Sequence, residues 1–193
     1  MASSTTTARA SARDRLLEAA NELFYAEGVQ TVGIDRIIER AGVAKASLYN
    51  VFGSKEELVA AYLESRHQGT ATRLSAAMEK IQDPREKIFA IFDEQAKQFR
   101  DPNFHGCAFV SASAEAPVGG LVEQATTEFR AWIRNTFAEL AKELGAAHPS
   151  TLARQLHLVY DGALLAADLD RNEPSVARSA REAVEALLNA SSV

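Results

Sequence analysis

Residues 41–59 of the chain read AGVAKASLYNVFGSKEELV, with a helix-sized segment between the two glycines Gly42 and Gly53. Within that segment Leu48 and Phe52 lie four residues apart, a spacing that places both side chains on one face of a helix. The other faces carry mainly small or polar side chains, namely Lys45, Ala46, Ser47, Tyr49 and Asn50. A helix with so little apolar surface is typical of one that presents its side chains to a partner.

The segments that precede and follow this stretch also have helical patterns. Between Ser11 and Gly28, apolar residues recur at the spacing of one helix face: Leu16, Leu17, Ala20, Leu23 and Phe24. A second, shorter helix ends at Gly42 and has its own apolar face: Ile34, Ile37, Ile38 and Ala41. Gly28 is the expected left-handed cap of the first helix, and Ser54 is the expected N-cap of a fourth. Three short helices around a glycine turn predict a helix-turn-helix, although a plain helical hairpin within a bundle has the same spacing.

Helical patterns continue through the rest of the chain. Pro84 is the expected first residue of a helix, a short helix follows within residues 107–117, and a long one covers residues 121–144. Two further apolar helices are expected over residues 151–169 and 173–188. Only five prolines and ten glycines interrupt the chain, and no segment has the pattern of a strand. The expected fold is all-α, with about nine helices in total.

The composition and net charge of the chain limit the classes of function that the protein can have. The net charge of −5 disfavours a polyanionic partner, but most of the deficit is C-terminal. Up to Arg66 there are eight Lys and Arg against nine Asp and Glu, and beyond it 13 against 17, so the N-terminal part can still present a basic face. A single cysteine excludes an internal disulfide and a four-cysteine zinc site. No apolar run approaches the roughly 20 residues of a membrane span, and the opening MASSTTTARASARDR lacks the apolar part of a signal peptide. We therefore expect a cytoplasmic protein with a disordered N-terminal arm.

A catalytic role is not indicated. The four histidines, at positions 67, 105, 148 and 157, do not have the spacing of metal ligands. His157 and Asp161 are four residues apart and form at most half of a metal site, and a hydrogen-bonded pair is the simpler interpretation. The sequence has no glycine-rich phosphate loop and no nucleophile elbow. We expect a protein that is not an enzyme and that has neither a cofactor nor a metal.

The polar side chains of the helix between Gly42 and Gly53 share one kind of chemistry. Lys45 can donate to a phosphate or to a guanine edge, and Asn50 has the paired donor and acceptor that match an adenine edge. Ser47 and Tyr49 offer hydroxyls to phosphate oxygens. Lys55 and the first backbone amides of the next helix can bind another phosphate. Because a DNA major groove admits such a helix, the segment is predicted to bind double-stranded DNA.

Residues 28–59, GVQTVGIDRIIERAGVAKASLYNVFGSKEELV, resemble the DNA-binding segment of the TetR family of bacterial transcription regulators. The family pattern has an isoleucine-rich second helix, Ala-Gly-Val, a recognition helix ending in Leu-Tyr and an aromatic residue, and then Ser-Lys-Glu-x-Leu. This chain has those elements at Ile37–Ile38, Ala41–Val43, Leu48–Tyr49, Phe52 and Ser54–Leu58. The resemblance spans residues 13–63, and the later two-thirds of the chain agree in size and helical plan.

The resemblance implies three parts and a set of DNA contacts. The parts are a flexible arm at residues 1–12, a helix-turn-helix DNA-binding domain at 13–60, and a ligand-binding and dimerisation domain at 61–193. Base contacts are implied for Lys45 and Ala46, with Asn50 near base edges. Phosphate contacts are implied for Ser47, Tyr49 and Lys55. Gly33 and Arg36 of the second-helix region complete the predicted set of DNA-binding residues.

Three positions depart from the family pattern. Ala44 stands where the recognition helix usually has a serine or threonine cap, and Gly33 stands where a hydroxyl residue often contacts phosphate. Asp35 places an acid in the second helix where a basic residue is common. We expect nearby basic residues either to compensate for the acid or to be ordinary surface charges; these are Arg36, Arg40, Arg9 and Arg13.

The C-terminal domain of the family usually forms a dimer through its last two helices, and the sequence supports this independently. Two apolar helices end the chain, and they carry small and branched residues that suit close packing. The candidate dimer interface consists of Leu156, Val159, Gly162, Ala163, Ala166, Val176, Ala180, Val184 and Leu187. Four such helices from two chains would form a bundle and place two recognition helices about 34 Å apart on a palindromic operator. Packing within a single chain is the alternative.

The resemblance also implies a small-molecule pocket. The candidate lining residues are Phe92, Gln95, Phe99, His105, Cys107, Phe109, Phe129 and Trp132. Their low polarity favours an apolar or aromatic effector, although aromatic residues at helical spacing are also what an ordinary core contains. Cys107 follows NFHG at the expected start of a short helix, where the helix dipole and His105 can lower the pKa of a thiol. Such a cysteine suggests an oxidant or electrophile sensor, and an inert core cysteine is the alternative.

These observations favour a homodimeric, sequence-specific DNA-binding repressor that a small ligand releases from its operator. A thiol-based sensing repressor that uses Cys107 is one alternative. A helix-turn-helix adaptor that acts through protein partners is another. The expected partners are a double-stranded palindromic operator, a small-molecule effector and a second copy of the chain, with no membrane.

Overall fold

The structure is a computed structural model that describes residues 10–171, 173 and 175–191. Throughout this part of the chain, all regular secondary structure is helical. The helices are α1 (Ala12–Glu27), α2 (Ile34–Ala41), α3 (Lys45–Phe52), α4 (Lys55–Met78), α5 (Pro84–Gln98), α6 (Ala108–Glu115), α7 (Leu121–Glu143), α8 (Pro149–Leu169) and α9 (Ser175–Ser191). The predicted all-α class is confirmed.

Local capping chemistry determines where several helices begin. The Ser11 hydroxyl accepts a hydrogen bond from the Asp14 amide at 3.1 Å, while the Asp14 carboxylate accepts from the Ser11 amide at 3.2 Å. Ser54 caps α4 in a similar way by accepting from the Glu57 amide at 3.1 Å. Each side chain satisfies an amide that has no partner inside its helix. The end of the predicted arm therefore belongs to the start of α1, and residues 1–9 of that arm lie outside the described residues.

Helices α1–α3 form a unit that we call the head, and its α2–α3 turn is held from two sides. Gly42 adopts a left-handed conformation with φ of +61°, and its amide donates to the Glu39 carbonyl at 3.1 Å. Glycine suits this position because it carries no Cβ. From α1, Arg15 Nη1 donates to the carbonyls of Ala41 at 3.1 Å and Gly42 at 3.0 Å. The guanidinium thus donates hydrogen bonds to carbonyls that have no partner inside α2, and it fixes the turn that positions α3.

The head has a small apolar core that continues into α4. Leu16, Ile37 and Leu48, one from each helix of the head, are fully buried. Phe24 of α1 meets Tyr62 of α4 edge to face, with ring centroids 5.6 Å apart. Aromatic pairs in this geometry add to the stabilisation from burial. The head is therefore packed directly onto α4.

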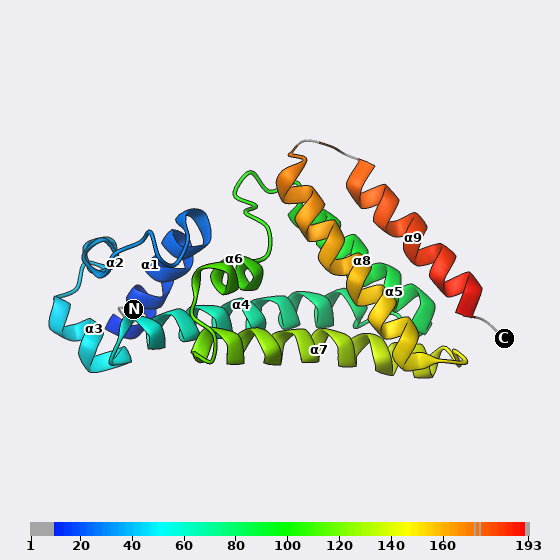
Figure 1. Ribbon diagram of the computed structural model, residues 1–193, viewed down its shortest axis with the longest axis horizontal. Coiled ribbons are helices and arrows are strands. Elements are labelled where there is room, and N and C mark those ends of the chain that lie inside the picture. The colour runs from blue at the N-terminus through cyan, green and yellow to red at the C-terminus, as the bar shows by residue number, and fades with distance from the viewer. Residues whose placement is uncertain (1–9, 172, 174, 192–193) are drawn as a thin grey trace, which may run out of the picture.

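The remaining helices form the body, which α4 joins to the head (Figure 1). With its 24 residues, α4 runs beside α7 and packs against α1, α5 and α7. At the far end, α8 lies against both α7 and α9. The predicted boundary between residues 60 and 61 falls inside α4, so one continuous helix crosses it. Among the described helices, none is both long and apolar enough to cross a membrane.

Candidate functional site

The outward face of α3 is polar and accessible. Lys45, Ala46, Tyr49 and Asn50 are exposed, and Tyr49 keeps 45% of its surface although it is aromatic. Leu48, on the opposite face, is completely buried, as its place in the sequence pattern predicts. The four exposed residues follow helical spacing and form a continuous surface on one side of the helix. This surface can enter a groove without disturbing the core below it.

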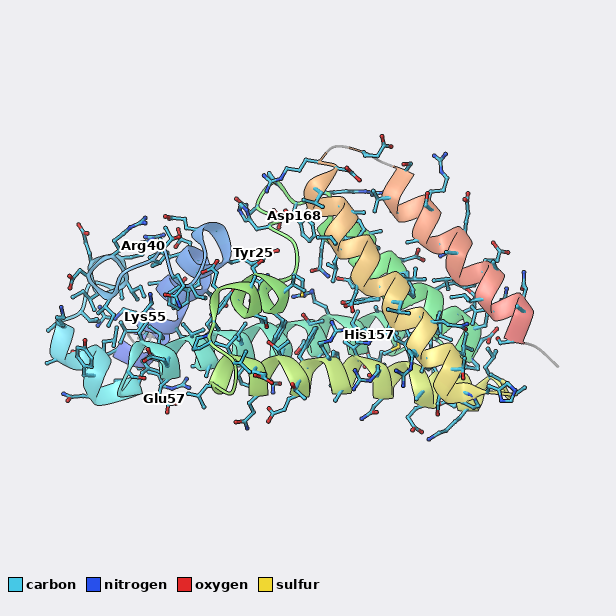
Figure 2. All side chains as sticks on the ribbon, viewed as in Figure 1. Tyr25, Arg40, Lys55, Glu57, His157 and Asp168 are labelled. Carbon is cyan, nitrogen blue, oxygen red and sulfur yellow. The ribbon has the colours of Figure 1, made fainter. Side chains whose placement is uncertain are left out.

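The remaining predicted contact residues of the helix-turn-helix border this face. Ser47 is half-buried in the first turn of α3, whose N-cap Ala44 makes no side-chain hydrogen bond. Lys55 is the first residue of α4, and Figure 2 shows it at the same end of the molecule as Arg40. None of the ion pairs in the described part of the chain involves Lys55. Its charge is therefore available to an anion.

The arginines of α2 are both paired with acids of α1. Arg36 donates to both carboxylate oxygens of Glu27, with Nη2 and Oε1 2.9 Å apart. Arg40 forms a similar two-point contact with Glu22, at 2.9 and 3.0 Å. The Arg36 guanidinium hydrogen-bonds the Glu27 carboxyl and lowers its pKa below the usual value. Two of the four charges expected to compensate for Asp35 are thus neutralised within the head.

Lys45 is also paired, but with an acid of the helix-turn-helix itself. Its Nζ lies 2.9 Å from Oδ1 of Asp35, near the start of α2, and this hydrogen bond raises the pKa of Lys45. Both side chains remain accessible, with 55% of Lys45 and 80% of Asp35 exposed. Gly33, the exposed N-cap of α2, can offer only its backbone to a partner. Arg9 lies outside the described residues.

A family model described as "Bacterial regulatory proteins, tetR family" matches residues 16–62, which run from α1 into α4. A solved TetR-family transcriptional regulator from Streptomyces coelicolor is 34% identical to this chain. The match covers 94% of this chain and 96% of that one, with a TM-score of 0.88. The chain belongs to the TetR family.

Other TetR-type proteins agree with this assignment. A TetR regulator structure from Streptomyces avermitilis is 32% identical, covering 94% of this chain and 98% of that one with a TM-score of 0.78. The Escherichia coli transcriptional repressor NemR is 27% identical over 83% of this chain and 85% of its own length. Its reduced form has been solved and has the same fold, at 24% identity, with a TM-score of 0.81 over 91% of this chain and 95% of that one. The chain is a helix-turn-helix DNA-binding transcriptional regulator, like these TetR-family relatives.

The aromatic residues predicted to line the effector pocket of this TetR-family chain pack against one another. Phe109 of α6 stacks on Phe129 of α7, with ring centroids 4.0 Å apart. His67 of α4, which the sequence pattern did not single out, contacts Phe129 at 5.5 Å and Trp132 at 4.9 Å. Helices α4, α6 and α7 thus bring three of the predicted residues into one cluster.

The other predicted pocket residues are distributed around this cluster. Phe92 is buried against the ring of Phe137, at 5.8 Å. The buried amide of Gln95 donates to the Tyr160 carbonyl at 2.9 Å, so it serves to tie α5 to α8. Phe99 contacts Phe104 at 5.4 Å, and His105 lies edge to face with Tyr25 at 5.5 Å. The sequence pattern identified apolar residues of the body without separating core from pocket.

The environment of Cys107 differs from the one expected. Cys107 is the N-cap of α6, as predicted, but burial raises the pKa of its thiol. Hydrogen bonds from the amides of Val110 and Phe109 oppose this effect and are weaker than the cost of desolvating a thiolate. The expectation of a lowered thiol pKa is therefore wrong, because the short helix is packed into the body.

His157 and Asp161 form part of a charge cluster between α7 and α8. His157 Nε2 lies 3.5 Å from one oxygen of Asp161, and Arg130 Nη2 lies 2.8 Å from the other. The carboxylate is thus occupied by an arginine from the neighbouring helix. Among the described residues, no group of three or more His, Cys, Asp or Glu is arranged to hold a metal ion.

The residues predicted to form the dimer interface divide into two groups. Leu156 and Val184 have no exposed surface, and Ala163 keeps 5%, so these three contribute to the core of the chain itself. They have almost no accessible surface to offer a second copy. A partly or fully accessible group remains: Val159, Gly162, Ala166, Val176, Ala180 and Leu187.

Three exposed leucines of α8 were not predicted from the sequence. Leu158, Leu165 and Leu169 keep 64%, 55% and 72% of their surface. They account for three of the eight large apolar side chains exposed in the described part of the chain. Their spacing of seven and four residues was visible in the sequence, but so was an apolar pattern on the opposite face of the same helix.

Proposed function

We propose that the chain is a homodimeric repressor that binds a two-fold symmetric operator and releases it when a small apolar or aromatic ligand binds the body. The accessible face of α3, formed by Lys45, Ala46, Tyr49 and Asn50 above the buried Leu48, carries this proposal. In this role Lys45, Ala46 and Asn50 meet base edges, and Tyr49 meets phosphate. The similarity to NemR, a repressor, over 83% of this chain supports repression.

A second copy is proposed to cover the outer faces of α8 and α9. Exposed residues of α8 alternate at spacings of four and three: Thr151, Gln155, Leu158, Gly162, Leu165 and Leu169. This alternation is the spacing of a seam between packed helices. Small exposed residues of α9 follow the same spacing: Ser179, Ala183, Ala186 and Ala190. A four-helix interface along this seam would bury the exposed leucines and allow close approach at the small residues.

Contacts between head and body offer a route from ligand to DNA. The Tyr25 hydroxyl of α1 donates to the Gly106 carbonyl at 3.0 Å and accepts from the His105 amide at 3.1 Å. A Cβ on Gly106 would lie 2.9 Å from an oxygen of Asp168, near the end of α8. Figure 2 shows Tyr25 and Asp168 on either side of the α5–α6 loop. That loop therefore touches the head on one side and the proposed dimer helix on the other.

A second contact lies at the C-terminal end of α6. The Glu115 carboxylate accepts from the Gln30 amide at 2.7 Å, and its carbonyl accepts from the Gln30 side chain at 3.2 Å. The proposed pocket residues His105, Cys107 and Phe109 lie on the same loop and helix as these contacts. A ligand that binds one arrangement of α6 more tightly than another shifts the head relative to the body. The two heads of a dimer then no longer match both half-sites.

The first experiment is a selection of bound duplexes from a random DNA pool. Binding to the most enriched duplex is then measured at several salt concentrations. We expect a two-fold symmetric site that a dimer occupies. Tyr49→Ala should weaken binding to all sequences, and Asn50→Ala should relax the preference at particular bases. Val118→Ala is a matched control, because Val118 is 93% exposed and lies in the body before α7. A folded protein that enriches no sequence at low salt would instead favour the adaptor that acts through protein partners.

The ligand half of the proposal has its own probe. Trp132 is the single tryptophan of the sequence, so its fluorescence reports directly on the ring cluster of α4, α6 and α7. We expect uncharged aromatic compounds that change this fluorescence to release the operator at the same concentrations. Compounds that change the fluorescence without releasing DNA would separate binding from regulation.

Thiol sensing at Cys107 is a second candidate, and the similarity to NemR, whose solved form is described as reduced, favours it. The raised pKa of the buried thiol predicts slow reaction in this conformation. We expect Cys107→Ser to respond to aromatic ligands as the parent does. Loss of an oxidant response in this variant, with the ligand response intact, would establish the thiol route.

A further inference from the structure

Lys45 and Asp35 form a donor and acceptor pair at the front of the helix-turn-helix. Lys45 is the first residue of α3 and Asp35 is in the first turn of α2, so both come from helix N-termini at the proposed DNA surface. Their Nζ and Oδ1 atoms are 2.9 Å apart, and both side chains are more than half exposed. The pair thus presents one ammonium and one carboxylate side by side to a partner.

Phosphate is a poor partner for this pair. A carboxylate 2.9 Å from the ammonium repels a phosphate and cancels much of its attraction to the lysine. The neighbouring arginines do not offset this, because Arg36 and Arg40 are held by Glu27 and Glu22 of α1. A partner for the pair must offer an acceptor and a donor together.

A G·C base pair offers this combination in the major groove. Guanine presents the acceptors O6 and N7, and cytosine presents the N4 amino group as a donor. Because O6 and N4 are hydrogen-bonded to each other, they lie about 2.9 Å apart, the usual N–H···O distance. The spacing within the Lys45–Asp35 pair matches this spacing. An A·T pair opposes the adenine amino group to the lysine and the thymine carbonyl to the aspartate.

We propose that Lys45 and Asp35 together read one G·C base pair in each half-site. Lys45 donates to guanine O6 or N7, and Asp35 accepts from cytosine N4. The assignment rests on the proposed operator-binding function and adds Asp35 as a specificity-determining residue. Asp35 also reduces the attraction of the head for phosphate in general, so non-specific binding is weakened while the matched base pair is kept.

The test measures binding to the selected operator and to duplexes in which each base pair of both half-sites is replaced in turn. For the parent protein, replacing the G·C pair should cost roughly 5- to 150-fold in affinity per half-site, the range for one good base contact. Asp35→Ala and Lys45→Met should each weaken the preference at that same base pair, because each removes one of its two contacts, and leave the preferences elsewhere unchanged. The double variant should relax the same position and no other.

Glu39→Ala is the matched control, because Glu39 is another exposed acid of α2 and its loss changes the net charge equally. We expect this variant to keep the G·C preference. If Asp35 only neutralises charge, Asp35→Ala strengthens binding to every duplex alike and keeps the preference, which overturns the proposal. A parent protein that selects no symmetric site contradicts the proposed function itself. Thermal unfolding of each variant separates these outcomes from a damaged head, and Lys45→Met tests the same base pair independently.

Discussion

Helices α3 and α8 both expose one face, but the two faces have opposite character. On α3 the exposed side chains are mostly polar, and the apolar Leu48 points into the head. On α8 both faces are apolar, with Leu156 fully buried and Leu158 and Leu165 more than half exposed. A helix with one apolar face can bury that face within its own chain. A helix with two apolar faces leaves one of them exposed, and this surface favours association.

This difference matches two kinds of partner. The accessible face of α3 consists of hydrogen-bonding groups that stay hydrated until they meet another polar surface, such as the edges of DNA bases. The outer face of α8 gains stability only when water is excluded from it. We therefore propose that α3 carries the DNA-binding function and that α8 carries self-association, and each prediction below tests one side of this division.

The largest effect is expected from Leu165→Asp on the outer face of α8. Leu165 is 55% exposed in the single chain, so a dimer buries the remaining surface twice, for about 2–3 kcal/mol in total. Two buried carboxylates add a desolvation cost. The dimer dissociation constant should rise at least about 100-fold, as measured by analytical ultracentrifugation.

Val118→Asp provides the control for that experiment. It makes the same apolar-to-acid exchange at a residue that is 93% exposed and lies outside α8. We expect its self-association to equal that of the parent. A folded Leu165→Asp variant with unchanged dimerisation would show that the outer face of α8 is not the interface.

The contrast between α3 and α8 also explains what could be predicted from the sequence. The inward position of Leu48, the turn at Gly42 and the Ser54 cap depend on neighbouring residues, so local patterns revealed them. The orientation of α8 was not predictable in this way, because apolar residues at helical spacing lie on two of its faces. Which face meets α7 and α9 depends on the packing of the whole body.

Contacts between residues far apart in the sequence were hidden for a related reason. Arg15 reaches the end of α2 across 26 residues, and the pairing of Arg36 with Glu27 depends on how α1 crosses α2. The burial of Cys107 depends on the docking of α6, which reversed the expected pKa shift of its thiol. Motif patterns identified the DNA-binding segment, and the charges that surround it could be assigned only in three dimensions.

The second-largest effect is expected from Arg15→Met in the head. This change keeps much of the aliphatic stem and removes the hydrogen bonds to the carbonyls of Ala41 and Gly42. Hydrogen bonds from a charged group contribute about 1.5–3 kcal/mol, so the free energy of unfolding should fall by about that amount. Chemical denaturation measures it. If the turn positions α3, operator affinity should fall as well.

Arg13→Met is the matched control for Arg15→Met. Arg13 lies on the same helix and contacts the Phe52 ring at 5.6 Å from its centroid. An exposed cation–π contact contributes about 0.5–1 kcal/mol, which is less than the Arg15 hydrogen bonds. Equal losses in both variants would mean that the turn is held by the packing of α2 and α3 without help from Arg15.

A smaller effect is expected on the salt dependence of operator binding, which should differ between unpaired and paired basic residues on the DNA-facing side. Lys55 has no acid partner within the described residues, whereas Arg36 is held by Glu27 at two points. Lys55→Gln should therefore reduce the magnitude of the salt-dependence slope of operator binding by about 2, the effect of one lost phosphate contact in each half-site of the dimer. Arg36→Gln should change the slope less. A larger change for Arg36 would show that DNA displaces Glu27 from it.

The smallest effect concerns His157 on the inward face of α8. Burial lowers the pKa of this histidine below its ordinary value, despite the nearby Asp161 carboxylate, and the charges of Arg130 and Arg134 act in the same direction as burial. As the pH falls below about 6.5, the unfolded chain therefore takes up a proton that the folded chain still refuses, and the free energy of unfolding decreases. His157→Gln removes this proton uptake, so it should lose less stability than the parent between pH 7.5 and pH 5.5 in urea unfolding experiments. Because the other titrating groups are common to both proteins, the difference between the two curves isolates His157. If the free energies of unfolding of the two proteins change with pH in parallel, His157 accepts its proton as readily in the folded chain as in the unfolded one. The inward face of α8 would then tolerate charge as the exposed face of α3 does.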